Sequence, residues 1–140
     1  MLRKGGTDAY NDIPQVRIAE GLSNPCRHCL QLIGEGEKKL VLAYMPFDTK
    51  QPYAETGPIF LHQQECGHYN SDIFPPWFMF LEPAIIRGYD DENWIVYETG
   101  AVISGSDIEK KCMTIFQNKD VEFVHIRSKY NCFQCKVERA

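Results

Sequence analysis

Two C-x-x-C pairs, one near each end of the chain, are the sequence feature that most constrains the fold. Cys26 and Cys29 lie in NPCRHCLQL, and Cys132 and Cys135 lie in YNCFQCKVERA. Structural zinc sites use four tetrahedral thiolate or imidazole ligands, and a spacing of two residues lets both sulfurs reach one ion. Because chain ends often lie close together in a domain, the pattern predicts one Zn²⁺ ion held by all four cysteines.

The residues around the two pairs leave open a second interpretation, in which the cysteines are reduced thiols without a metal. Zinc knuckles favour a glycine near the second cysteine because the loop needs a positive φ, but Leu30 and Lys136 follow here. If CFQCKVE is a regular strand, Cys132 and Cys135 project to opposite faces. They would then share an ion only if the backbone turns between them.

A thiol redox protein is the third interpretation of these pairs. Arg27 and His28 stand between the first two cysteines, and positive neighbours lower the pKa of a thiol. Cys26 would then be a reactive cysteine. A thioredoxin-like pair opens a helix, however, and neither pair here precedes a predicted helix.

A further ligand-rich stretch, HQQECGH, covers residues 62–68. His62, Cys66 and His68 would complete a metal shell if only one cysteine of each pair binds. We expect His68 to lie in a polar loop, and the sequence does not decide between the two roles for His62 and Cys66. The remaining cysteine, Cys112, falls on the apolar side of a predicted helix and is expected in the core.

Composition indicates one globular domain and excludes several classes of protein. The chain has 140 residues, 44% of them hydrophobic, and a net charge of −4, so we expect no attraction to nucleic acid and none to a membrane surface. Its most apolar stretch, residues 73–81, contains two prolines and is too short to span a bilayer. The start lacks the apolar core of a signal peptide, so we expect a cytoplasmic protein with reduced thiols.

The hydrophobic pattern predicts an α+β fold, a single domain with a mostly antiparallel sheet of about six strands and one clear helix. The helix is expected at about 106–118, beginning with the capping box SDIE at 106–109. We expect residues 1–24 to be a loosely structured amino-terminal segment with one short strand-like stretch, QVRIAEG, and residues 25–140 to form the domain. The expected strands are 38–47, 58–63, 80–90, 94–103, 121–127 and the final CFQCKVE.

Four basic side chains stand in or at the ends of predicted strands: His62, Arg87, His125 and Arg127. A buried arginine needs a partner or a ligand because an unpaired buried charge is costly. If these strands are neighbours, the four residues would converge on a small anionic ligand such as a carboxylate or phosphate. Structural ion pairs with nearby carboxylates are the other interpretation.

Seven motifs taken in order resemble a known family: PCRHCL, YMPFD, PYAETGPIFLH, IIRGYD, VYETG, VHIRS and CFQCKVERA. They resemble a bacterial family of small proteins known as domain of unknown function 1203. The resemblance covers the chain from about residue 15 to its end. It implies no established activity, substrate or cofactor.

The sequence therefore predicts an uncharacterised small domain stabilised by zinc, with a binding or interaction role. A module for a small anionic ligand and a thiol redox protein are the alternatives. No G-x-S-x-G, P-loop, Rossmann or H-E-x-x-H motif is present, so the sequence does not decide whether the protein is an enzyme. The sequence gives no indication of a protein partner.

Overall fold

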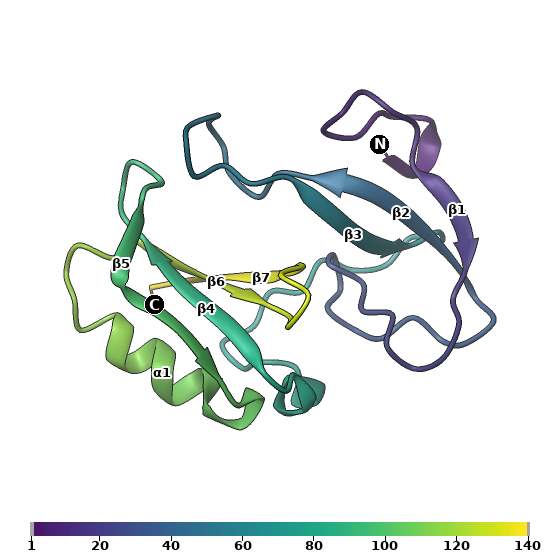
Figure 1. Cartoon of the computed structure of the whole chain (residues 1–140). Coiled ribbons are helices and arrows are strands. Elements are labelled where there is room, and N and C mark those ends of the chain that lie inside the picture. The colour runs from purple at the N-terminus through teal and green to yellow at the C-terminus, as the bar shows by residue number, and fades with distance from the viewer. Residues whose placement is uncertain (1, 140) are drawn as a thin grey trace. The chain divides into compact units, whose positions relative to one another are not determined.

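The computed structural model describes residues 2–139, which contain seven β-strands and one α-helix (Figure 1). The strands form two antiparallel sheets, so the predicted α+β class is confirmed. Contacts group the chain into two compact units. The first unit comprises residues 2–46 and 55–70, and the second comprises 47–54 and 71–139.

The first unit is built on a sheet of three strands, β1 (Gln15–Ile18), β2 (Lys38–Tyr44) and β3 (Gly57–His62), in that order. Leu40 pairs with Leu61 and Leu42 pairs with Ile59 across the two longer strands. These four side chains are buried, as expected for alternate residues that share one face of a sheet.

The predicted loose segment, residues 1–24, contains two elements within its described part. A 3-10 helix spans Leu2–Lys4, and β1 pairs with β2 although all four of its residues are exposed. The Asp8 carboxylate also accepts a hydrogen bond from the Ala43 backbone N–H at 3.0 Å. The division into a segment 1–24 and a domain 25–140 stays a prediction.

The second unit is built on a sheet of four strands in the order β5-β4-β6-β7. Their bounds are Ala84–Tyr89 for β4, Ile95–Ile103 for β5, Phe123–Arg127 for β6 and Phe133–Glu138 for β7. All five residues of β6 are buried, which is expected of a central strand covered on both faces. Short 3-10 helices at Pro76–Phe80 and Gly105–Asp107 flank β4 and β5.

Helix α1 (Ile108–Ile115) lies on one face of this second sheet next to β4 (Figure 1). Ile108, Cys112 and Ile115 are buried, which confirms the predicted apolar stripe and the core position of Cys112. The predicted capping box is not formed. Residues 105–107 make a 3-10 turn instead, and the Ser106 hydroxyl lies 3.1 Å from the hydroxyl of Ser104.

Within residues 2–139, no helix has both the length and the apolar character needed to cross a bilayer.

Candidate metal site

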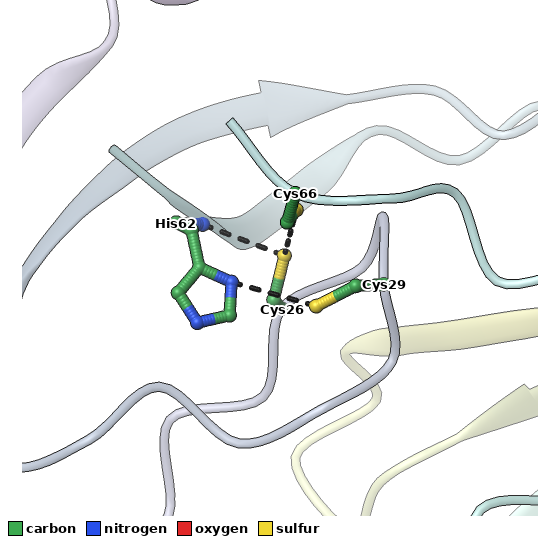
Figure 2. A group of neighbouring side chains, drawn as sticks. All are labelled: Cys26, Cys29, His62 and Cys66. Carbon is green, nitrogen blue, oxygen red and sulfur yellow. Dashed lines mark hydrogen bonds between the residues drawn. The ribbon is translucent and has the colours of Figure 1, made fainter. Parts of the chain in front are cut away.

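Four potential metal ligands meet in the first unit: Cys26, Cys29, His62 and Cys66 (Figure 2). Each offers one ligand atom, and these atoms all lie within 4.8 Å of one another. They come from three places in the chain, namely the first C-x-x-C loop, the last residue of β3 and the segment after β3. Three thiols and one imidazole in this arrangement can hold a metal ion.

The backbone of the C-x-x-C loop turns as a metal knuckle requires. The Leu30 N–H donates to the Cys26 carbonyl oxygen, and the Cys26 N–H donates to the carbonyl oxygen of Gln31, both at 2.9 Å. Leu30 has a φ of 57°, the left-handed conformation that glycine usually supplies. Burial of the Leu30 side chain offsets the steric cost, so the missing glycine does not prevent the turn.

Strand β3 fixes the position of this loop and of His62. The Arg27 N–H donates to the carbonyl oxygen of Phe60 at 3.0 Å, which attaches the loop to the strand. His62 is the last residue of β3 and pairs with Lys39 of β2. Its Nδ1 lies 3.5 Å from the Cys29 Sγ, while its backbone N–H donates to the Cys26 Sγ at 3.4 Å (Figure 2).

Cys66 enters the cluster from the irregular segment that follows β3. Its Sγ lies 3.8 Å from the Cys26 Sγ. The Arg3 guanidinium donates to the same sulfur at 3.2 Å, and the His28 Nδ1 lies 3.4 Å from it. The Tyr69 N–H donates to the His28 carbonyl oxygen at 2.8 Å, which holds the segment against the C-x-x-C loop.

The two cysteines of the loop have opposite ionisation behaviour. Burial opposes ionisation of Cys26, but hydrogen bonds from the backbone N–H groups of Cys29, His62 and His28 outweigh it and lower the Cys26 pKa to about 6. Burial, together with the neighbouring Cys26 sulfur, raises the pKa of Cys29 to about 12. One thiolate therefore forms readily in the cluster, and its charge opposes formation of a second one when no cation is bound.

The second C-x-x-C pair lies in the other unit. Cys135 is on β7, where it pairs with Ile126 and is buried, and burial raises the pKa of its thiol. Cys132 precedes β7 and is half-buried. A site that joins this pair to Cys26 and Cys29 would span both units, so the four-cysteine zinc site stays a prediction.

The four predicted anion-binding residues are also divided between the units. Arg87 and His125 are partners across β4 and β6, and Arg127 follows on the same face of β6. His62 belongs to the group of four candidate metal ligands in the first unit. Both arginines donate to Asn131, Arg87 to its side-chain oxygen at 3.3 Å and Arg127 to its backbone oxygen at 3.1 Å. Anion binding by this set stays a prediction.

Two functional features were missed or left undecided by the sequence. The sequence places His62 in the anion-binding set and leaves its role as a metal ligand, and that of Cys66, undecided, although HQQEC at the end of a strand is the available signal. Arg3 was not identified. Its Nε donates to the His62 carbonyl oxygen at 2.9 Å in addition to its contact with Cys66, and no local motif predicts so distant a partner.

Comparison with known proteins gives one match. A family model described as "Protein of unknown function (DUF1203)" matches residues 23–139, a range that includes all four candidate metal ligands and begins after Arg3. No curated protein matches the chain significantly, and neither does any solved structure.

Proposed function

The chain belongs to the DUF1203 family, and we propose that it binds one Zn²⁺ ion through Cys26, Cys29, His62 and Cys66. The ion would stabilise the first unit by joining the C-x-x-C loop, the end of β3 and the segment after it. The protein would then act as a zinc-stabilised binding or interaction module.

The spacing of the ligand atoms carries this proposal. Zn–S bonds of about 2.3 Å and Zn–N bonds of about 2.0 Å at tetrahedral angles put two sulfurs about 3.8 Å apart and a sulfur and a nitrogen about 3.5 Å apart. The Cys26 and Cys66 sulfurs are 3.8 Å apart. The Cys29 sulfur and the His62 Nδ1 are 3.5 Å apart.

The ligand types favour zinc over other metals. Thiolates select zinc, copper(I) and iron–sulfur clusters, whereas calcium and magnesium prefer oxygen. Ligand atoms that all lie within 4.8 Å of one another fit a single ion, because a bridged cluster of two irons holds its ligands at opposite ends. A tetrahedral ion with three thiolates and one imidazole is typical of structural zinc.

The number of ligands favours a binding role over chemistry at the metal. Catalytic zinc keeps one position for water or substrate, whereas structural zinc has four protein ligands. Cys26, Cys29, His62 and Cys66 would fill the shell. The free energy of zinc binding would then contribute to folding of the first unit, as it does in other small zinc domains.

Metal content tests the proposal. Protein purified without chelator should show the mass of one zinc by native mass spectrometry, and the mass should disappear on denaturation. Cys66→Ser and His62→Ala should each reduce the zinc content well below one per chain. Cys132→Ser is the matched control because Cys132 is a half-buried cysteine of the second unit.

Two results would contradict the proposal. One is a metal-free parent protein that also fails to take up added zinc. The other is a Cys66→Ser variant with full zinc content beside a Cys132→Ser variant without zinc.

A further inference from the structure

We propose that the zinc site is also a site of thiol oxidation, at which a peroxide oxidises Cys66, Cys26 forms a disulfide with it, and the ion is released. This inference rests on the proposed zinc site and adds a reaction to it. The reaction would link the stability of the first unit to the peroxide concentration.

Solvent exposure distinguishes Cys66 from Cys26. The Cys26 side chain has no exposed surface, whereas Cys66 is half-buried. Cys66 also lies in a stretch without helix or strand between β3 and the 3-10 helix Pro76–Phe80. A peroxide from solvent would therefore meet the Cys66 sulfur before that of Cys26, since oxidation of a thiol requires access from solvent.

Two nitrogen-containing side chains lie beside the Cys66 sulfur, and neither is a proposed zinc ligand. The Arg3 guanidinium donates to it at 3.2 Å, and the His28 Nδ1 lies 3.4 Å away. A guanidinium at this distance can donate to the oxygen that leaves when a peroxide bond breaks. Arg3 is held in place by its second hydrogen bond, to the His62 carbonyl oxygen at 2.9 Å.

Cys26 is placed to react with the oxidised Cys66. Their sulfurs are 3.8 Å apart, and a disulfide bond is about 2.05 Å long. Cys26 is fixed by its backbone hydrogen bonds to Gln31 and Leu30, so the Cys66 segment would make most of the movement. Redox-sensing cysteines are typically accessible and adjacent to such a second cysteine.

The reaction balances with a peroxide as the only oxidant. The Cys66 thiolate attacks one oxygen of hydrogen peroxide, so that an S–O bond forms, the O–O bond breaks and hydroxide leaves. The Cys26 thiolate then attacks the Cys66 sulfur, so that an S–S bond forms, the S–O bond breaks and a second hydroxide leaves. The two sulfurs together lose two electrons, and zinc loses two of its four ligands.

To test the inference, zinc-loaded protein is treated with hydrogen peroxide. Free zinc is then measured with a chromophoric chelator, and disulfides are mapped by peptide mass spectrometry. We expect one zinc released for each disulfide formed, with Cys26–Cys66 as the main bond. A main bond between Cys26 and Cys29 would overturn the inference, and so would oxidation that leaves the zinc bound.

Two variants identify the reacting sulfur. Cys66→His keeps a zinc ligand but removes the thiol, so peroxide should release its zinc at least tenfold more slowly than in the parent. Cys132→Ser should release zinc at the parental rate. Equal rates for Cys66→His and the parent would overturn the inference. Absence of zinc before peroxide is added would instead contradict the proposed function.

Discussion

His125 should make the second unit less stable at mildly acidic pH. The side chain has no exposed surface, and neither ring nitrogen has a hydrogen-bond partner among residues 2–139. The centroid of its ring lies 4.9 to 5.1 Å from the centroids of four aromatic rings, those of Phe47, Tyr89, Phe123 and Phe133. Protonation would therefore place a charge among apolar groups.

The pKa of His125 gives the size of this effect. Burial, together with the positive charges of Arg127, Lys136 and Arg87, lowers the pKa from 6.5 to about 3. Above pH 6.5 the ring is neutral in both the folded and the unfolded chain. Below it the unfolded chain binds a proton that the folded chain does not accept until about pH 3, so stability falls. At about 1.4 kcal/mol per pKa unit, the loss between pH 7 and pH 5 is about 2 kcal/mol.

Urea denaturation at pH 7 and pH 5, followed by tryptophan fluorescence, measures this loss. Both tryptophans, Trp77 and Trp94, belong to the second unit, so the signal is separate from the metal site. His125→Phe should remove most of the pH dependence and should be at least as stable as the parent at pH 5. His68→Ala, which changes an exposed histidine of the first unit, should keep the full dependence. An unchanged pH dependence in His125→Phe would refute the reasoning.

Three further predictions concern the metal site and the core. Arg3→Ala should weaken zinc binding about 10- to 100-fold in a chelator competition, because groups that bond to metal ligands affect affinity by this much; Lys4→Ala should leave it unchanged. Cys135→Ser should lower the free energy of unfolding by about 1–3 kcal/mol in urea, since it buries a hydroxyl in place of a thiol, while the zinc content stays at one. Gly105→Ala should reduce the melting temperature by several degrees, since its Cβ would lie 2.6 Å from the Leu81 carbonyl oxygen. Gly57→Ala, which meets no atom within 4 Å, should have little effect. Unchanged zinc affinity in Arg3→Ala, or equal melting of the two glycine variants, would contradict these expectations.

The parts of the fold that the sequence predicted depend on local pattern. The apolar stripe Ile108, Cys112 and Ile115 identified α1, because spacing along a helix directly gives its buried face. The α+β class followed from the short apolar runs that were counted as about six strands beside one helix. The division of seven strands into two sheets was not predicted, because strand pairing joins residues far apart in the chain and no local signal records it.

In the candidate site, too, local spacing predicted some residues, whereas residues brought together from distant parts of the chain were not predicted. The spacing of Cys26 and Cys29 marked them as paired ligands, because two intervening residues bring both sulfurs to one side of a turn. Spacing does not specify the other two candidate ligands, which depend on where β3 ends and how the chain returns after it. His62 and Cys66 occupy those places in the first unit, while Cys135 is a core residue of the second sheet.

X-ray absorption at the zinc edge tests the central claim most directly, because it counts the sulfur and nitrogen atoms around the ion. The Cys26, Cys29, His62 and Cys66 site predicts three sulfurs at about 2.3 Å and one nitrogen at about 2.0 Å. Four sulfurs would contradict it and would favour the set with Cys132 and Cys135. A shell of oxygen ligands would show that the zinc is bound elsewhere.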